Sequence, residues 1–431
     1  MHFKKTLLVC VVLLSVSKVT VAGPVSLAKD GDRGASLGPT ECSPMEVWDF
    51  HMAMCMPVAM RGMPMSMAMV QGNSFFTGTF ESGPRGRSAF SVPDMVMVDV
   101  GTSIGEYHYV NLDFMGTIEK WTYPSSGTPE LLQIGESQVS GQPFLDAQHP
   151  HSSPIMGLTL SDTITWGSGK DHGKLWFAPR GESTDGPVAF MHRPTGQVNP
   201  QAPLGHHIGQ DVGHISSTVF GGSVRIGETT LEVSTFSGSE PQPTQVDLPL
   251  GAPNSYALRM INLFSPRVYG MMSVAFVRSP EPSEPSLDHV WRYSASIYDE
   301  VQLSPEWKLS DALIWGLING YDGASALNSF TEEILLSAKD RRFWGRLEIL
   351  QRTPAELAIS VQGDVNSGQW VSALTTGYTQ RLANWNGAEL GLGGSLTVDI
   401  LPVDDQASYG GDPVIGQVFL QLSGMKMWNL N

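Results

Sequence analysis

Polar and apolar side chains alternate along most of the chain, in short segments that are separated by turn residues. In Arg292–Tyr298, arginine and serine alternate with tyrosine, alanine and isoleucine, and Gln417–Ser423 and Thr230–Phe236 show the same two-residue period. This period is typical of β-strands, whose successive side chains point to opposite faces. If these segments were helical, their charged side chains would surround the helix on all sides. The chain from about residue 74 onward is therefore predicted to be all-β.

The alternation marks sixteen candidate strands, and clusters of turn residues separate many of them. They span residues 74–81, 90–101, 107–121, 155–166, 173–180, 214–226, 230–239, 255–265, 268–278, 290–302, 307–319, 331–339, 343–352, 369–382, 387–400 and 414–428. Several exceed the ~5–6 residues of an average strand in soluble proteins. Aromatic residues lie near the strand ends, namely Trp121, Tyr123, Trp166, Trp176, Trp291, Trp307, Trp344, Trp370 and Trp428.

Long alternating strands with aromatic residues near both ends are typical of outer-membrane barrels, in which apolar side chains face lipid and polar side chains face the lumen. We therefore predict an all-β fold, a transmembrane antiparallel β-barrel of about 14–16 strands. A large secreted β-sandwich or a propeller is the alternative, although no clear repeat period supports a propeller.

The chain divides into three predicted regions. Residues 1–22 have the features of a signal peptide, with two lysines before an apolar run and small residues at the cleavage site. Residues 23–69 are predicted to be a flexible (disordered), Met-rich periplasmic segment, and residues 70–431 to be the outer-membrane barrel. A long Pro-, Gly- and His-rich loop at about 181–213 interrupts the alternation. In a barrel, such a loop can fold inward and constrict the lumen.

Charge and hydropathy bear on the location of the protein. After the signal peptide no apolar stretch approaches the ~20 residues that a membrane-spanning helix needs. The chain has 26 basic and 42 acidic residues and a formal net charge of −16. Nucleic acid is not an expected partner, because clustered basic charge supplies the affinity for it. The predicted location is the outer membrane of a Gram-negative-type bacterium, with outer-membrane lipid as the partner.

Nine of the 20 methionines lie between residues 45 and 69, mostly at every second position. In an extended chain such side chains share one edge at intervals of about 6.5–7 Å, and thioether sulfur is a soft ligand that suits Cu(I). Apolar packing is the alternative, since Met fills irregular gaps well. Cys55 can supply a thiolate or form a disulfide with Cys42. The candidate metal ligands are Met52, Met54, Met56, Met63, Met65, Met67, Met69, His51 and Cys55.

Seven histidines lie between residues 149 and 214, with aspartates and arginines among them. Imidazole is a common metal ligand, but the spacing of these residues matches no zinc signature. They are predicted to form either a second metal site or a constriction of the lumen. A hydrogen-bonded network that braces an inward loop is the alternative. The residues are His149, His151, His192, His206, His207, Asp211, His214, Arg180 and Arg193.

A weak enzymatic hypothesis rests on two His-x-Ser sequences, His151–Ser153 and His214–Ser216. On a strand, positions i and i+2 share a face, so an imidazole can act as the base for a serine hydroxyl. The motif resembles the His-x-Ser of outer-membrane phospholipase, but that family's flanking residues are absent and no third catalytic residue can be assigned. The leading expectation is that the protein is not an enzyme.

Four further segments carry a resemblance, namely Glu81–Arg87, Asn111–Pro124, Asp146–Pro154 and Leu204–His214. They are similar to segments of an uncharacterised bacterial family of Met/His-rich predicted outer-membrane β-barrel proteins, and the likeness covers roughly residues 56–430. The order of export signal, Met-rich segment and barrel is also similar to copper resistance protein B, although repeated Met-Asp-His units are absent here. This second resemblance implies copper handling.

The leading functional hypothesis is binding or export of soft metal ions, copper first, in metal tolerance. A copper ion is the expected cofactor, and periplasmic metal-handling proteins are the expected partners. The alternatives are a passive channel or structural barrel with a His-lined constriction, and an outer-membrane lipid hydrolase. The positions of five of these histidines would separate the hypotheses: His149, His151, His206, His207 and His214. A metal site is favoured if their side chains lie within a few ångströms of one another, and a network that braces the loop is favoured if they are scattered.

Overall fold

The computed structural model describes residues 46–50, 54–57, 65–137, 143–151, 153–167, 171–240, 250–280, 287–320, 326–361 and 363–430. The predicted signal peptide and three of the candidate ligands, His51, Met52 and Met63, lie outside these residues. Among the helices that are described, none is long and apolar enough to cross a bilayer.

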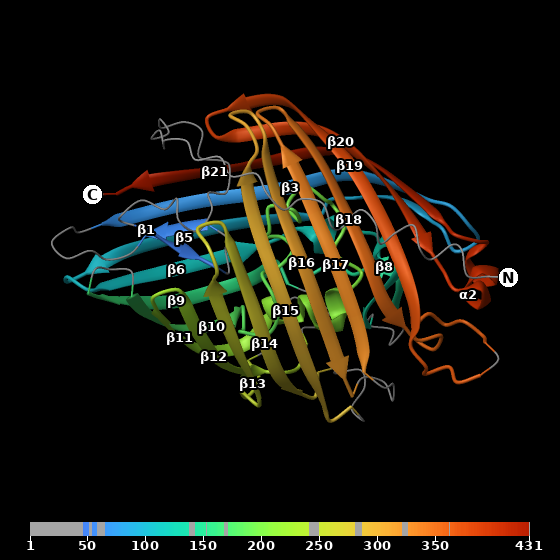
Figure 1. The fold of residues 1–431 in the computed structure, drawn as a ribbon, viewed down its shortest axis with the longest axis horizontal. Coiled ribbons are helices and arrows are strands. Elements are labelled where there is room, and N and C mark those ends of the chain that lie inside the picture. Colours follow the sequence, from blue (N-terminus) through green and yellow to red (C-terminus); the bar gives the residue numbers. More distant parts are fainter. Residues whose placement is uncertain are drawn as a thin grey trace. The chain divides into compact units, whose positions relative to one another are not determined.

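The wall of the barrel is one closed antiparallel sheet, in which strands follow each other in chain order and the last strand pairs with the first (Figure 1). The short β4 and the longer β5 act as one strand, because both pair with β3 and only two residues separate them. The wall therefore has sixteen strands. They are β3 (Ser66–Glu81), β4 (Ser88–Ser91) with β5 (Asp94–Ile104), β6 (His108–Gly116), β9 (Ile155–Trp166), β10 (Asp171–Gly181), β11 (Ser216–Ile226), β12 (Thr229–Ser237), β13 (Ser255–Leu263), β14 (Val268–Arg278), β15 (His289–Gln302), β16 (Lys308–Asn319), β17 (Leu327–Ser337), β18 (Arg341–Arg352), β19 (Gln369–Trp385), β20 (Ala388–Ile400) and β21 (Val414–Asn429).

Each predicted strand coincides with a strand of the wall, so the predicted β-barrel is confirmed. The predicted strand 107–121 ends early, at Gly116. The Asp94 carboxylate accepts a hydrogen bond from the backbone N–H of Ile118 (3.0 Å), and the chain then turns into the short helix α1 (Glu119–Thr122). The Asp94 side chain on the neighbouring strand thus binds a backbone N–H that the sheet would otherwise use, and β6 ends there.

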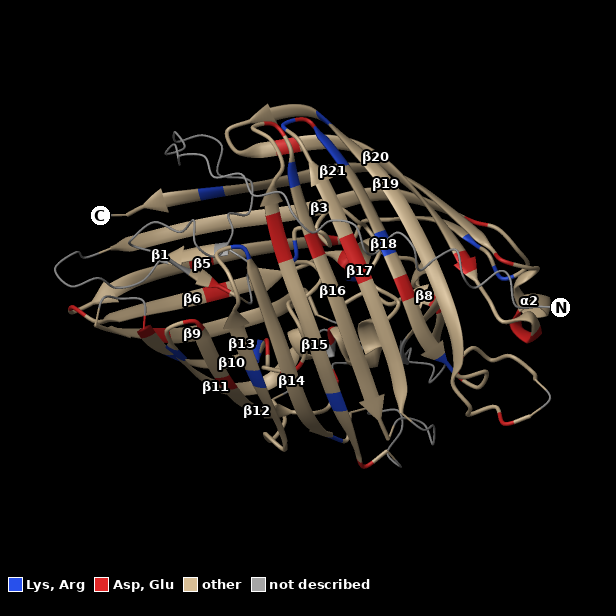
Figure 2. Cartoon of the chain, viewed as in Figure 1, with Lys and Arg blue, Asp and Glu red and all other residues tan. Residues whose placement is uncertain are grey.

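The outer face of the wall is largely apolar and the inner face is polar, which is the reverse of a soluble protein. On β19, Leu374 is 53% exposed, whereas the next residue, Thr375, is 2% exposed. Figure 2 shows charged residues along β15–β18, and the strands bury many charged side chains, including Arg259, Arg292, Glu333, Arg346, Glu348 and Arg352. Asp299, Asp311 and Glu332 alternate with these inward positions and interrupt the apolar outer face. An apolar outer face of this extent fits contact with hydrocarbon.

Aromatic side chains form two rims on the outer face. Phe330 and Trp370 stack at one end of β17–β19, with ring centroids 6.2 Å apart. Phe343 and Tyr378 lie at the other end of the same strands, with ring centroids 4.8 Å apart. These two rims are the aromatic girdles of a membrane barrel, and they bracket the part of the wall that faces the lipid core.

Two of the tryptophans near predicted strand ends, Trp176 and Trp344, point inward instead of joining these rims. Each ring lies over a glycine that pairs with it on the neighbouring strand. A Cβ atom would lie 2.0 Å from the Trp176 ring at Gly221 and 2.1 Å from the Trp344 ring at Gly377. Because glycine has no side chain, the indole fits over it on the inner face. A position near a strand end therefore did not suffice to predict an outward-facing tryptophan. Tyr123, another aromatic residue near a predicted strand end, is also buried.

Two segments enter the barrel between consecutive strands of the wall. The first contains α1 and a hairpin of β7 (Thr128–Ser137) and β8 (Pro143–Gln148), which the alternation did not predict. The second, residues 182–215, is the predicted inward loop and contains the short turns η2 (His206–Gln210) and η3 (Val212–His214) (Figure 1). Both segments pack in one apolar cluster with the wall, which includes Leu131, Leu132, Leu204, Ile208, Leu327 and Leu350.

The described part of the Met-rich segment is also packed against the wall. Here β1 (Glu46–Asp49) pairs with β2 (Met54–Pro57). The rings of Trp48 and Phe50 lie 6.4 and 5.1 Å, centroid to centroid, from the buried ring of Tyr269 on β14.

At the other end of the chain, the helix α2 (Val403–Tyr409) connects β20 to β21.

Candidate functional site

A buried ion pair holds the inward segment 182–215 to the wall. Arg193 donates two parallel hydrogen bonds to Glu333 of β17, from Nε to Oε2 and from Nη2 to Oε1, both 2.9 Å long. The hydroxyl of Thr195 donates to the same carboxylate (2.6 Å), and Arg193 Nη1 donates to the carbonyl of Val188 (2.8 Å). Arg193, predicted as a constriction residue, therefore forms a buried ion pair with Glu333 that attaches the segment to the wall. This ion pair is called the brace below.

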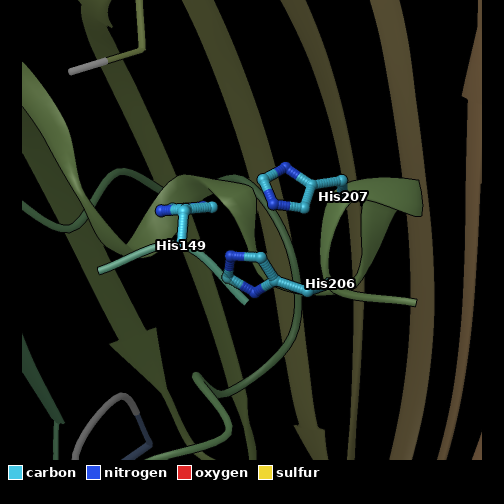
Figure 3. A group of neighbouring side chains, drawn as sticks. All are labelled: His149, His206 and His207. Carbon is cyan, nitrogen blue, oxygen red and sulfur yellow. The ribbon is translucent and has the colours of Figure 1, made fainter. Parts of the chain in front are cut away.

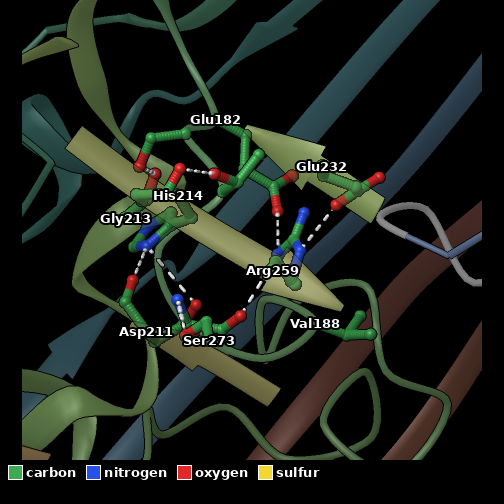
Figure 4. A network of polar contacts seen from close by, with 12 residues as sticks. Glu182, Val188, Asp211, Gly213, His214, Glu232, Arg259 and Ser273 are labelled. Atoms are coloured by element: carbon green, nitrogen blue, oxygen red, sulfur yellow. Dashed lines mark hydrogen bonds and ion pairs between the residues drawn. The ribbon is translucent and has the colours of Figure 1, made fainter. Parts of the chain in front are cut away.

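Other arginines of the wall bind the same segment. Arg259 of β13 lies between two carboxylates, 2.7 Å from Glu232 and 3.6 Å from Glu182 (Figure 4). Arg346 of β18 donates to the backbone carbonyl of Gln201 over 2.9 Å. Because these contacts come from several strands, the segment is fixed across the barrel interior rather than at one edge.

Five of the candidate histidines converge inside the barrel. Ligand atoms of His149, His206 and His207 all lie within 4.8 Å of one another (Figure 3), and those of His206, Asp211 and His214 do so as well. The ring of His151 lies 5.7 Å, centroid to centroid, from that of His214. The first and last of the five in sequence come from different inward segments, so the cluster exists only because both segments enter the same barrel.

The backbone of η2 explains how two adjacent histidines are presented together. Gly209 has a φ of +68°, a left-handed conformation that glycine adopts without strain. A Cβ atom there would lie 2.7 Å from the backbone nitrogen of Leu317, so the turn presses directly against β16. Ser329 of β17 donates to the carbonyl of Ile208 (2.7 Å) and accepts from Gln210 (3.0 Å). The turn that carries His206 and His207 is thus bonded to the wall.

A chain of hydrogen bonds supports the cluster from one side. Glu119 of α1 accepts from His151 Nδ1 (2.6 Å) and from the hydroxyl of Tyr123 (3.0 Å). His151 Nε2 lies 3.4 Å from His214 Nε2, and His214 Nδ1 contacts the carbonyl of Asp211. With His151 protonated beside Glu119, His151 donates to His214, and His214 donates to Asp211.

The electrostatics of this chain agree with that assignment. Burial by itself raises the pKa of Glu119, but the adjacent His151 outweighs it and holds the pKa below its usual range. Burial opposes the charged form of His151, but the Glu119 carboxylate outweighs it and raises the pKa of His151 above its ordinary value. Burial lowers the pKa of His214 to about 4 and that of His149 to about 3, and it also lowers the pKa of His207 well below its ordinary value. These three imidazoles are therefore neutral at neutral pH.

Three predicted site residues do not join the cluster, and one of them, Arg193, is the residue that pairs with Glu333. His192 and Arg180 are buried, but neither belongs to a group of metal-ligating side chains among the residues that the structure describes. The predicted residues that the structure brings together are therefore the two overlapping groups around His206, with His151 beside His214.

The described Met side chains of the tract are packed rather than gathered around a point. Met65 and Met67 pack with Tyr109 in the wall, and Met69 of β3 is buried. Since β3 begins at Ser66, Met67 and Met69 belong to the wall and not to the predicted flexible segment. Met56 lies in β2, as do Met54, whose side chain is not described, and Cys55. Cys55 is disulfide-bonded and therefore presents no thiolate to a metal.

Sequence reasoning missed two features of the interior. One is Glu119, which has no sequence signal that separates it from an ordinary surface acid. The other is a buried cluster of methionines outside the Met-rich tract, for which the Met-x-Met pair at 95 and 97 was an available signal. The cluster contains Met95, Met97, Met115, Met156 and Met191.

The hydrolase geometry is not formed by either His-x-Ser copy in the described part of the chain. His151 is engaged by Glu119, and the Ser153 hydroxyl oxygen accepts the N–H of Ile155 (3.1 Å). In the second copy, the Ser216 hydroxyl lies 3.2 Å from that of Ser183, while its histidine contacts a backbone carbonyl. The prediction that i and i+2 would share a strand face was wrong, because His151 precedes β9 and His214 lies in η3, before β11 begins.

Comparisons with known proteins agree with the fold. No protein-family model matches the sequence, and the search of curated proteins gives no match. Among solved structures, an anion-selective porin from Comamonas acidovorans is 10% identical, with 84% of this chain and 99% of the porin covered and a TM-score of 0.50. The OmpF of Salmonella typhi, solved in complex with daunomycin, is 6% identical, with coverage of 83% and 97% and a TM-score of 0.50.

These observations define the class of the protein. A closed sixteen-stranded sheet, an apolar outer face and two aromatic rims make it an outer-membrane β-barrel protein, located in the outer membrane in contact with its lipid. The inward segments and their histidine cluster are what distinguish its interior.

Proposed function

We propose that the protein is a passive outer-membrane channel whose bore is narrowed by the inward segment 182–215. The observation that supports this function is a set of buried ion pairs, which includes the brace Arg193–Glu333. These ion pairs attach a polar segment to the inside of a sixteen-stranded barrel. Barrels of ~16–18 strands are wide enough to leave an aqueous channel. A segment fixed inside such a barrel sets the size of solute that passes, and the polar inner face keeps the path hydrated.

Conductance in a planar bilayer tests this proposal. The purified full chain is expected to give stepwise ion conductance in buffer that contains EDTA, because a passive channel needs no metal. The same protein after heat denaturation is the control, and folding is checked by heat-dependent migration in gels. Silent bilayers with folded protein would contradict the channel.

A second candidate function is the binding of soft metal ions, copper first, by the methionine side chains. The observation in its favour is the density of thioethers in and beside β3, where Met65, Met67 and Met69 share one face of the chain. Their packing with Tyr109 is the competing explanation.

Titration with Cu(I) separates these two explanations. If the tract binds the ion, replacement of its methionines from Met52 to Met69 by leucine is expected to weaken Cu(I) binding by at least about tenfold, since leucine keeps the apolar volume and removes the soft ligand. The double variant Met260→Leu/Met272→Leu, at exposed paired positions of β13 and β14, is the control for nonspecific thioether binding. Equal affinity of all three proteins would leave packing as the role of the tract.

A further inference from the structure

We propose that His149, His206 and His207 form a binding site inside the barrel for a divalent transition-metal ion of the zinc, nickel or copper(II) class. This site goes beyond the proposed channel function, because it assigns a ligand to the interior that passive conduction does not require. It also differs from the Met-rich tract, whose thioethers prefer a softer, monovalent ion.

The spacing of the three rings is close to that of a metal centre. Their ligand atoms lie within 4.8 Å of one another, and the ring centroids are 4.6 Å apart for His206 and His207 and 5.4 Å apart for His149 and His207. In a tetrahedral zinc site with metal–nitrogen distances of about 2.0–2.1 Å, the nitrogens are about 3.4 Å apart. Small rotations of the partly buried rings of His149 and His207 close that difference, and Figure 3 shows the three rings arranged around a common space.

The hydrogen bonds of the triad leave ligand atoms available. His149 Nδ1 lies 3.0 Å from the carbonyl of Pro150 and donates to it, so the lone pair of its Nε2 is not used by that bond. A backbone carbonyl that holds one ring nitrogen is the usual support of a metal-binding histidine. His206 is 9% exposed, and its Nδ1 lies 3.8 Å from a carboxylate oxygen of Asp211. A carboxylate beside one ring nitrogen supports a metal-binding histidine in the same way, and Nε2 of His206 faces the other two rings (Figure 3).

The second group of potential ligands, His206 with Asp211 and His214, is less suited to bind the ion. Both nitrogens of His214 are engaged, one by His151 and one by the Asp211 carbonyl. The Asp211 carboxylate accepts the backbone N–H of Phe190 over 2.8 Å. These contacts make the second group a support that positions His206 for the first.

The chemistry of the triad selects the class of ion. Three imidazoles suit zinc, nickel and copper(II). Three protein ligands leave a fourth position for water or a solute. His149 and His207 are only partly buried, so an ion in the interior can reach the site.

Zinc titration of the full chain in detergent, after removal of metals with EDTA, tests the site. We expect one tightly bound ion per chain by calorimetry, and weakening by at least about tenfold in His149→Gln and in His207→Gln, because each loses a ligand. The exposed His289 at the start of β15 provides the matched control, His289→Gln, which should bind as the original protein does. No binding, or equal binding by all variants, would overturn the proposal.

A spectroscopic measurement keeps the test decisive if a variant fails to fold. Copper(II) bound to the unaltered chain is expected to show hyperfine splitting from imidazole nitrogens in electron paramagnetic resonance, and a spectrum with oxygen ligands alone would overturn the site. Conductance is recorded on the same proteins, so absence of zinc binding by an unaltered chain that conducts normally would refute only the metal site. Loss of conductance with intact zinc binding would refute only the channel.

Discussion

Replacement of Glu333 by alanine is expected to destabilise the protein by about 3–5 kcal/mol, the usual cost of removing one partner from a buried ion pair. Arg193 would keep its charge in a buried position with only the Val188 carbonyl as a partner, and the Thr195 hydroxyl would lose its acceptor. Because this pair is the brace of the inward segment, the variant is also expected to show larger and noisier conductance. Urea unfolding in lipid vesicles and planar-bilayer recordings measure the two effects.

Two further variants interpret that result. Glu332→Ala removes the adjacent carboxylate on the other face of β17 and should leave conductance unchanged. The double variant Arg193→Met/Glu333→Leu replaces the pair by apolar side chains and should recover much of the lost stability, because it leaves no unpaired charge. If Glu333→Ala behaves like Glu332→Ala, the inward segment is held by other contacts.

Introduction of a charge at Leu374 is the second substitution with a large expected effect. Leu374 lies on the outer face of β19, four residues from each of the two rim aromatics Trp370 and Tyr378, which places it near the middle of the lipid-facing band. Its cross-strand partners, Leu347 and Val398, are apolar and offer no counter-charge. Leu374→Arg is therefore expected to cost about 2–4 kcal/mol, the range for arginine at the bilayer midplane of a barrel.

The measurement is the free energy of unfolding in vesicles, followed by tryptophan fluorescence. Leu374→Phe is the matched control, because it enlarges the side chain and keeps it apolar, and it should fall within roughly 1 kcal/mol of the original protein. An arginine variant as stable as the phenylalanine variant would show that this face of the wall does not meet hydrocarbon.

The course of the wall was predictable because strand formation in a barrel follows a local rule. In β19, the alternation of Leu374 and Thr375 is visible in the sequence without any knowledge of the partner strands, and it matches the two environments of the folded wall. The rule fails where a distant side chain intervenes. The carboxylate of Asp94 ends β6, and the bare backbone of Gly377 draws Trp344 inward.

For the interior, the sequence predicted which polar residues were available but not how they are arranged. The sequence showed that His149, His206 and His207 lie near loops, but 57 positions separate the first from the second. Their approach depends on two insertions entering one lumen, on the left-handed turn at Gly209 and on the contacts of η2 with β17. None of these three features produces a periodic pattern or a characteristic spacing in the sequence.

The sequence by itself therefore determined the sixteen strands, the apolar outer face and the presence of a long polar segment between β10 and β11, because each depends on neighbours along the chain. Only the tertiary structure decided which histidines meet, that Glu119 supports them, and that Arg193 pairs with Glu333. These contacts join residues that are remote in sequence, and closure of the barrel is what brings them within bonding distance.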